Sequence, residues 1–534
     1  MQSEIAALEA KLSDKNWRLE NLYQIRDKDG QIIPFNPNPE QKRYFKNRHN
    51  RNFVPKARKL GMSTGIVIDY LDTCLFPPVG EDGKPVQVEV GHVDLREPDA
   101  FKKLAMAKLA WDKGPAHKKP EIAQLWNLIH ESNPMVRSSD GLLSWSNGCR
   151  QEAGVSFTGT TPLRLHMSEY GPISARFPGK ATELKRGAMN AVPSTGIIDI
   201  ETTMEGGQFG ECYKIFKLAQ SCEGKPLSRL DWKLHFYPWW THEDYQLEGL
   251  EPTVGAILDY FAKIEKDHGI KLSPARMAWY EKIAALNGEE VYQQFPTTVE
   301  EVDRQIVPGQ IFPQMKTVRH EGRVTAFNPD RGYPIFTSWD LGSSDNSAGW
   351  VIQPAGKAHN ILDWCCGEGV GAAGVAEVIR EWESRHGALA GHFIPHDAEI
   401  TDKGSGKTFV AQLVECGIPR EKITVVPRIP DKWVGIEEVR RILPNCWFHV
   451  RADQPVKSGL DAAELPGGVG RLEGYRKKLD RSTNILADVI VKDICDHTAD
   501  ALRTYAEALS RDLVVANVPD RREKVTVLSG YRGR

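Results

Sequence analysis

KARKLGMST, residues 56–64, decides how the first half of this chain is interpreted. It follows a short apolar segment containing Phe53 and Val54 and precedes a second one, GIVIDY, residues 65–70. A loop between a strand and a helix presents backbone N–H groups and the positive end of the helix to phosphates. The stretch therefore predicts a phosphate-binding loop, with Ser63 at the position whose hydroxyl binds Mg²⁺ in such loops.

One residue of this stretch departs from the usual pattern. Met62 stands where a phosphate-binding loop normally carries its lysine. On the motif alone, a basic surface loop is therefore an alternative interpretation.

Two further segments place polar residues at the ends of expected strands. LRLHMSEYG, residues 163–171, ends a strand in Ser168-Glu169, and a carboxylate at this place is suited to activating an attacking water. GIIDIETT, residues 196–203, ends in Thr202 and Thr203. Polar residues at the carboxyl ends of strands point into the ligand crevice of an open α/β sheet. In isolation, Glu169 would be interpreted as a surface glutamate after a strand.

The order of elements predicts two α/β domains. Short apolar strands alternate with helical segments from about residue 50 to 205, and a second pattern runs from PIFTSWDLG, residues 334–342, to a helix near 497–510. Turn formers and basic residues are frequent between them. We therefore expect a first domain at 1–310, a linker at 311–332, a second domain at 333–510 and a basic tail at 511–534.

Three aspartates of the second domain are candidate metal ligands. Asp340 and Asp397 each end an expected strand, and Asp500 lies in the helix DHTADALRTYAEAL, residues 496–509. This order is that of the RNase H-like fold, and a two-metal nuclease needs several carboxylates that converge on its ions. His497 and Asp493 are secondary candidates, for which a helix-end hydrogen bond or an N-cap is the alternative role.

Two other basic segments are weaker candidates. Gly404-Ser-Gly-Lys-Thr408 resembles a phosphate loop, but Thr401 stands where its first glycine is required. We interpret it as a nuclease loop in which Lys403 and Lys407 contact DNA phosphates, or else as a solvated loop. The stretch 467–481 holds five basic residues and could follow a DNA backbone, although a charged helix surface explains it as well.

Taken in order, these motifs resemble the large terminase family of tailed bacteriophages over about residues 35–510. FNPNPEQKRYF, residues 35–45, is similar to its adenine-contacting Q motif, with Gln41 as the glutamine. VYQQFPTTVEEV, residues 291–302, resembles the segment that closes its ATPase domain. The phosphate lysine of the family often lies at the start of the loop, which here is Lys56, with Arg58 nearby.

The resemblance implies an N-terminal P-loop (RecA-like) ATPase domain and a C-terminal RNase H-like nuclease domain. Its ATP-binding residues would be Gln41, Lys56, Arg58, Gly61, Ser63 and Thr64. Glu169 would activate water, Thr202 and Thr203 would couple the nucleotide state to DNA grip, and Asp340, Asp397 and Asp500 would bind the nuclease metals. Ser168 replaces the usual aspartate before Glu169, which leaves its help with Mg²⁺ in doubt.

The resemblance also implies cofactors, partners and a location. The cofactors are ATP and Mg²⁺, with Mn²⁺ as a substitute in the nuclease. The partners are double-stranded DNA, the portal protein of the procapsid, the small terminase subunit and further copies of the chain in a ring. The implied location is the host cytoplasm, with no place in the mature virion.

Composition agrees with a globular cytosolic protein and leaves two rival functions open. The net charge of −2 excludes a uniformly basic surface but not a local DNA-binding patch. The nine cysteines contain no CxxC pair, which favours free thiols over a zinc site. The rivals are a cellular helicase–nuclease of DNA repair, which would need helicase motifs that are not found after residue 220, and a non-enzymatic adaptor with a degenerate loop.

Overall fold

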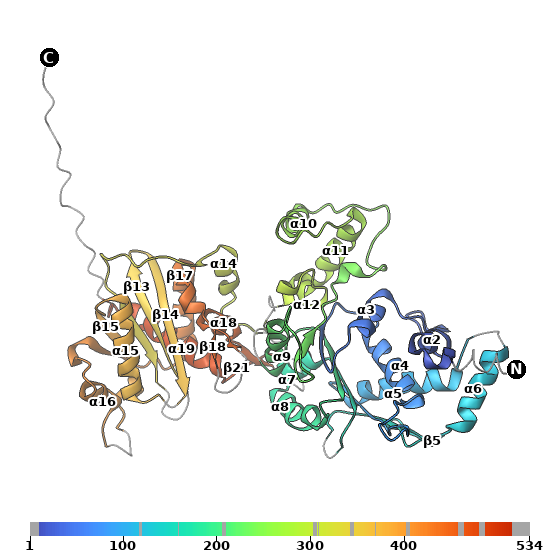
Figure 1. Ribbon diagram of the computed structural model, residues 1–534. Coiled ribbons are helices and arrows are strands. Elements are labelled where there is room, and N and C mark those ends of the chain that lie inside the picture. The colour runs from blue at the N-terminus through green and yellow to red at the C-terminus, as the bar shows by residue number, and fades with distance from the viewer. Residues whose placement is uncertain are drawn as a thin grey trace. The chain divides into compact units, whose positions relative to one another are not determined.

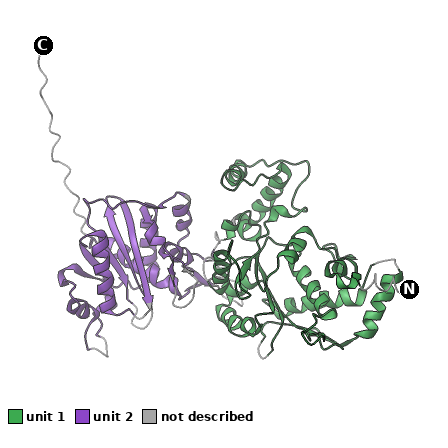
Figure 2. Ribbon diagram, viewed as in Figure 1, with its two compact units in different colours: residues 1–306, 459–463 green, residues 307–458, 464–534 purple. Residues whose placement is uncertain are grey.

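The computed structural model divides the chain into two units, which Figure 2 colours separately. Unit 1 comprises residues 1–306 and 459–463, and unit 2 comprises residues 307–458 and 464–534. The structure describes residues 10–116, 120–157, 160–205, 210–302, 307, 309–341, 346–368, 370–401, 406–457, 464–479 and 486–514.

Unit 1 is built on an eight-stranded sheet (Figure 1). In sheet order its strands are β10 (Trp232–Leu234), β3 (Arg51–Pro55), β9 (Ile197–Thr202), β8 (Arg164–Ser168), β4 (Glu89–Val93), β7 (Arg150–Gly154), β6 (Leu142–Trp145) and β5 (Met135–Ser138). The strands from β10 to β7 are mutually parallel, and β6 and β5 are antiparallel to their neighbours. Strand β9 therefore lies between the strand that enters the loop and the strand that ends at Ser168.

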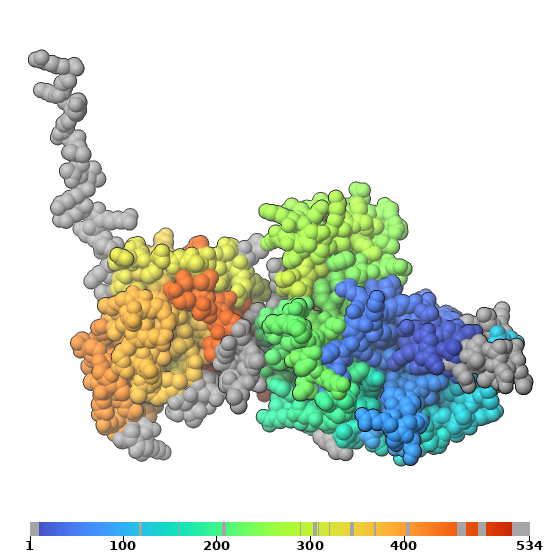
Figure 3. All heavy atoms as spheres, viewed as in Figure 1, coloured from blue at the N-terminus to red at the C-terminus, as the bar shows by residue number. Residues whose placement is uncertain are grey.

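Helices cover both faces of this sheet. The α-helices described in unit 1 are α2 (Lys15–Asn21), α3 (Pro39–Asn47), α4 (Met62–Leu75), α5 (Glu97–Lys113), α6 (Pro120–Ser132), α7 (Tyr170–Arg176), α8 (Pro178–Leu184), α9 (Gly210–Ser221), α10 (Gly255–His268), α11 (Pro274–Asn287), α12 (Val291–Gln294) and α13 (Val299–Val302). A two-stranded sheet of β1 (Gln24–Arg26) and β2 (Ile32–Pro34) accompanies them. Residues around α10 and α11 form a lobe that stands out from the rest of unit 1 (Figure 3).

Strand alternation assigns each residue of unit 1's sheet to one of two cores. Successive side chains of a strand point to opposite faces. Val54 accordingly packs with α4, α5 and α6, whereas Phe53 packs with α7, α8 and α9. Ile198 and Ile200 of β9 belong to the second core, so the residues between and after them face α4. Glu201 is one of these, and its position determines the chemistry of the site.

Unit 2 contains a seven-stranded sheet. In sheet order its strands are β11 (Val324–Thr325), β17 (Cys446–His449), β14 (Ala358–Glu368), β13 (Asn346–Ala355), β12 (Phe336–Asp340), β15 (Gly391–Pro395) and β16 (Ile423–Val426). Strands β12, β13 and β14 form an antiparallel meander, and β15 and β16 continue parallel to β12. This is the strand arrangement expected of an RNase H-like fold, so the predicted α/β class is confirmed for both units.

Two helices place the end of β12 between them. Trp339 packs against Trp382 of α15 (Ala372–His386), and Ser338 donates a 2.6 Å hydrogen bond to the Ala501 carbonyl of α19 (Ile494–Leu509). Because side chains alternate along a strand, Asp340 points to the same side of β12 as Ser338, towards α19. The unit also contains α14 (Gln314–His320), α16 (Phe409–Glu415), α17 (Lys432–Ile442), α18 (Gly468–Gly474) and the pairs β18 (Val456–Lys457) with β19 (Glu464–Leu465) and β20 (Lys477–Leu479) with β21 (Leu486–Ile490).

The prediction of a linker at residues 311–332 is wrong. These residues contain α14 and β11, and β11 extends the sheet of unit 2 by pairing with β17. Arg323 is buried and donates to the carbonyls of Leu443 and Cys446, which fixes the segment to the unit. Turn formers and basic residues indicate an exposed connection. Here, however, the Arg323 guanidinium is hydrogen-bonded inside the unit, and the backbone of β11 is paired with β17. Within the described part of the chain, no helix combines the length and apolar character needed to cross a membrane.

Candidate functional site

The loop between β3 and α4 is held by segments that are distant in sequence. Its N–H groups at Lys56, Ala57 and Arg58 donate to the carbonyls of Thr202 (3.1 Å), Tyr237 (3.3 Å) and Gln294 (2.9 Å). Lys59 and Gly61 have positive φ angles of 58° and 74°, which reverse the chain before α4 begins at Met62. The first N–H groups of a helix have no intrahelical partner, so the start of α4 can offer donors to an anion, whereas the N–H groups of Lys56, Ala57 and Arg58 are already bonded. Phosphate binding by this loop stays a prediction.

Gln41 holds the loop through hydrogen bonds within the protein. Its Nε2 donates to the Gly61 carbonyl (2.7 Å), and its Oε1 accepts from the backbone N–H of Asn38 (2.9 Å). The Asn38 side chain donates to the Leu60 carbonyl (3.0 Å). Gln41 is also buried, and its side chain lies 3.0 Å from where a Cβ on Gly65 would be. The structure thus gives Gln41 a role in shaping the loop, and its predicted contact with adenine stays a prediction.

Lys56 and Ser63 meet at a buried carboxylate that the sequence interpretation did not single out. The Lys56 ammonium lies 3.0 Å from Glu201 Oε2, and the Ser63 hydroxyl donates to Glu201 Oε1 at 2.5 Å. Burial alone would lower the pKa of Lys56, but the carboxylates of Glu201 and Glu169 raise it above its ordinary value. Burial alone would raise the pKa of Glu201, but Lys56 and His166 hold it well below its usual range.

Ser168 and Glu169 lie beside this cluster at the end of β8. The Ser168 hydroxyl donates to Glu201 Oε1 at 2.8 Å. Glu169 has a φ of 55°, a left-handed conformation that is uncommon for a residue with a side chain and that often occurs at functional sites. Burial raises the pKa of Glu169, Lys56 opposes this, and the nearby Glu201 adds to the rise. A carboxyl group with a raised pKa is suited to general-base work near neutral pH.

Thr202 and Thr203 differ in their surroundings. Thr203 Oγ1 donates to Glu169 Oε2 at 3.2 Å, which connects it directly to the candidate base. Thr202 points to the opposite side, where its Oγ1 accepts from the Gly171 N–H (2.8 Å) and donates to the Thr203 carbonyl (2.7 Å). Both threonines are buried, and of the two it is Thr203 whose side chain contacts Glu169. Their coupling role stays a prediction.

In the portion of the chain that the structure describes, three other loop residues, Met62, Thr64 and Arg58, form no hydrogen bond to Glu201 or Glu169. Met62 is 1% exposed and belongs to the core that packs α4 against the sheet. Thr64 contacts the sulfur of Met106, and the Arg58 carbonyl accepts from the Tyr245 hydroxyl. The Arg58 side chain is exposed and carries no bond that would fix it towards a phosphate among the described residues.

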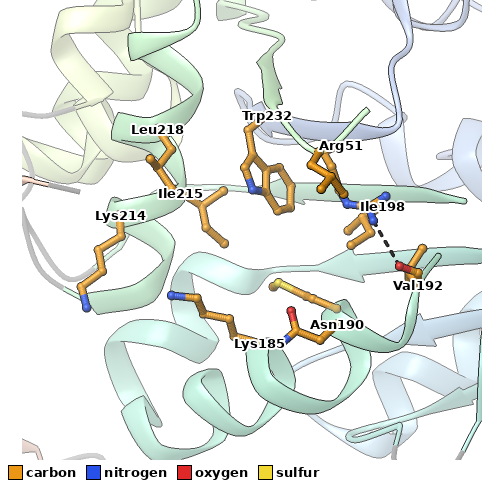
Figure 4. A pocket seen from close by; sticks show the side chains of 11 residues that line it. Arg51, Lys185, Asn190, Val192, Ile198, Lys214, Ile215, Leu218 and Trp232 are labelled. Carbon is orange, nitrogen blue, oxygen red and sulfur yellow. Dashed lines mark hydrogen bonds between the residues drawn. The ribbon is translucent and has the colours of Figure 1, made fainter. Parts of the chain in front are cut away.

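A cavity of about 270 Å³ in unit 1 lies at the other end of the strands (Figure 4). Its lining includes Arg51 and Trp232, the first residues of β3 and β10, and Ile198, the second residue of β9. Figure 4 shows the Arg51 guanidinium turned towards the Val192 carbonyl, to which it donates at 3.2 Å. This cavity is separate from the cluster at the carboxyl ends of the strands.

In unit 2, Asp340 lies at the end of β12 next to His497 of α19. His497 Nδ1 and Asp340 Oδ2 are 2.9 Å apart. Burial raises the pKa of Asp340; the His497 hydrogen bond opposes this, and the nearby charges of Asp500 and Asp397 add to the rise. The Asp340 hydrogen bond also raises the pKa of His497. The structure therefore brings the predicted Asp340 close to the secondary candidate His497.

Asp500 is held by two cationic side chains. Lys432 of α17 lies 2.9 Å from Asp500 Oδ2 and 2.8 Å from Asp496 Oδ1, and Arg503 lies 3.1 Å from Asp500 Oδ1. Asp496 and Lys432 were not among the predicted site residues. Asp496 lies one helical turn before Asp500, a spacing that places both on one helix face and that could have identified it.

Asp397 lies in a short 3₁₀ turn, His396–Glu399, directly after β15, and it is exposed. Asp493 caps α19 by accepting from the Cys495 N–H (2.9 Å) and pairs with Arg476 at 2.9 Å, which is the alternative role considered for it. Among the described residues, no group of three or more His, Cys, Asp or Glu side chains is arranged to hold a metal ion. The metal-binding role of Asp340, Asp397 and Asp500 stays a prediction.

Two basic segments of unit 2 were candidates for contact with DNA phosphates. Lys403 lies outside the described residues, and Lys407 forms an exposed 2.5 Å ion pair with Glu415. In the stretch 467–481, Arg471 and Tyr475 are buried. Arg471 packs over Trp364 and donates to the Pro466 carbonyl, so neither of these two residues can follow a DNA backbone.

Comparisons with known proteins identify similar structures. No family model and no curated protein sequence matches the chain. The large terminase of bacteriophage HK97 is 14% identical over 83% of this chain and 93% of that chain, with a TM-score of 0.39. The large terminase of a thermophilic bacteriophage is 11% identical over 89% and 100%, with a TM-score of 0.29. The large terminase nuclease of thermophilic phage G20c is 12% identical over 37% and 96%, with a TM-score of 0.25. Large terminases are what this chain is similar to.

Proposed function

We propose that this chain is a DNA-packaging motor that hydrolyses ATP to move double-stranded DNA into a procapsid and cuts concatemeric DNA with a metal-dependent nuclease. One observation carries the proposal: Lys56 is buried in the loop between β3 and α4, and the carboxylate of Glu169, at the end of the parallel strand β8, acts on its charge. This combination is what hydrolysis of a nucleoside triphosphate requires.

The ATPase chemistry is proposed from the residues of unit 1. Lys56 and the amides at the start of α4 would hold the phosphates, and Ser63 would ligate Mg²⁺, which neutralises the phosphate charge. Glu169 would accept a proton from the attacking water. Because Thr203 contacts Glu169, a change at the phosphates could reach β9 through this hydrogen bond.

The nuclease chemistry is proposed from the carboxylates of unit 2. Asp340, Asp397 and Asp500 offer oxygen donors of the kind that Mg²⁺ and Mn²⁺ prefer. Metal ions would supply an activated water and stabilise the charge of the cleaved phosphate. Lys432 and Arg503 contact both oxygens of Asp500, so these side chains must give up contacts if Asp500 binds a metal. In the similar structures, one large terminase holds ADP and the G20c nuclease holds cobalt.

The proposed partners follow from this function. They are double-stranded DNA, a portal protein, a small terminase subunit and further copies of the chain in a ring. The proposed location is the host cytoplasm.

A paired assay on the purified full chain tests the proposal. ATP hydrolysis is measured with and without linear double-stranded DNA, and plasmid cleavage is measured in Mn²⁺. We expect Glu169→Gln to lose hydrolysis by about 100-fold or more while it keeps cleavage, because removal of a general base usually costs this much. Asp340→Asn should show the opposite pattern. A wild-type chain that hydrolyses no ATP would favour the adaptor, and duplex unwinding would favour the helicase.

A further inference from the structure

Glu201 is a buried carboxylate on which the candidate ATPase site converges. It is 0% exposed. Its Oε1 accepts from the hydroxyls of Ser63 (2.5 Å) and Ser168 (2.8 Å), and its Oε2 faces the Lys56 ammonium at 3.0 Å. His166 Nε2 lies 3.4 Å from Oε1. Three of these four neighbours are residues that sequence motifs had already placed at the site.

The sheet topology explains why Glu201 reaches all of them. Strand β9 lies between β3 and β8, and Glu201 is paired in register with Val54 on one side and with Ser168 on the other. It faces α4 because Ile198 and Ile200 face the opposite core. One side chain can therefore contact the loop, the first turn of α4 and the end of β8.

A purely structural role does not explain this residue well. Burying a carboxylate costs several kcal/mol, and a buried ion pair often stabilises a fold no more than apolar residues of similar size would. On the same face of β9, Asp199 is also buried, but its partners Tyr44, Tyr70 and Arg48 lie away from the loop, whereas those of Glu201 include the loop residues Lys56 and Ser63. The pairing of Glu201 with the loop lysine Lys56 instead points to a role in the chemistry of the loop.

We propose that Glu201 is a positioning residue of the ATPase site, which supplies from β9 the carboxylate that Ser168 does not supply from β8. In phosphate-loop enzymes, an acidic residue at the end of the neighbouring strand works with the loop Ser or Thr to hold Mg²⁺. Here that strand ends in Ser168, and the carboxylate beside Ser63 comes from the next strand. The inference rests on the proposed ATPase function.

In this role, Glu201 orients two groups. The Ser63 hydroxyl donates its proton to Glu201, which leaves its oxygen lone pairs available to a divalent cation. The Lys56 ammonium is held at the start of the loop, where bound phosphates could draw it away from Oε2. Glu201 thus acts through Ser63 and Lys56, whereas Glu169 remains the candidate base.

The 2.8 Å contact between Ser168 and Glu201 permits a specific test, in which the carboxylate is moved between strands. Glu201→Gln should reduce kcat at least tenfold, because the amide cannot hold Lys56 and Ser63 as the carboxylate does. Ser168→Asp alone should also reduce kcat, because it places a second carboxylate against Glu201, and like charges in one site repel. The double variant Ser168→Asp with Glu201→Gln should recover at least tenfold over the slower single variant. It should also recover the dependence of the rate on Mg²⁺ concentration.

Glu152→Gln, on β7 of the same sheet, changes a glutamate that pairs with Arg150 away from the loop, and it should leave kcat unchanged. If Glu201→Gln does not fold, Glu201→Asp keeps the charge but retracts it from Ser63 and Lys56, and it should still lower kcat at least tenfold.

A folded Glu201 variant with a kcat within twofold of the wild type would overturn the inference alone. So would a double variant that is no faster than the slower single variant. A wild-type chain without ATPase activity would overturn the proposed function and this inference with it.

Discussion

Replacing Met62 tests how the loop joins α4. Its side chain is 1% exposed within the core between α4 and the sheet, although Met62 occupies the position of the usual phosphate lysine. Truncating a buried methionine to alanine typically costs about 2–5 kcal/mol, because the lost apolar contacts leave a cavity. We therefore expect Met62→Ala to lower the free energy of unfolding of unit 1 by this amount. ATP turnover per folded molecule should stay close to that of the wild type.

Urea unfolding followed by circular dichroism measures the loss, and ATPase assays are run where the variant is folded. Met62→Leu keeps the volume and should cost less than about 1.5 kcal/mol. Met62→Lys restores the usual residue of the motif but buries an ammonium among apolar groups, so it should destabilise the unit more than alanine does. This reasoning would be refuted by an alanine variant that no longer binds ATP although its free energy of unfolding falls by less than about 1 kcal/mol. The side chain of Met62 would then face the nucleotide.

Three further predictions concern the carboxylates. The ATPase rate should fall on the acid side with a midpoint above the ordinary glutamate value, because burial raises the pKa of Glu169; a pH profile of kcat checks this. Asp340→Asn should raise the melting temperature at pH 7 in chelator, because an acid with a raised folded pKa destabilises the fold when it is ionised; a lower melting temperature would contradict this. Lys432→Met should lower the melting temperature in chelator, because it leaves Asp496 and Asp500 facing each other, and Mn²⁺ should restore it if these carboxylates bind cations; thermal melts with and without Mn²⁺ decide.

The sequence alone predicts the position of those helices and strands in which apolar residues recur at a regular spacing. The strand expected at 196–203 is β9, and the helix expected near 497–510 is α19. The alternation of apolar and polar residues in β9 also contained the information that Glu201 and Thr202 face opposite ways. Motif order groups Thr202 with Thr203, although the side chains of the two residues have different surroundings.

Other features depended on contacts that no local pattern contains. Gln41 meets Gly61 only because α3 packs beside the loop, and Lys432 meets Asp500 only because α17 packs against α19. Arg323 is polar and lies in a turn-rich stretch, so its burial in unit 2 could not be inferred from composition. Long-range packing decides such partners, and a single sequence does not specify it.

The anchoring of the phosphate loop also constrains the order in which unit 1 can form. Loop residues such as Arg58 are synthesised early, but the carbonyl that accepts the Arg58 N–H belongs to Gln294, near the end of the unit. A growing chain folds domain by domain and cannot use partners that the ribosome has not yet made. The loop would therefore reach its final shape only after α12 has emerged. A ligand stabilises only the state that binds it, so nucleotide would stabilise the finished unit and not the nascent chain.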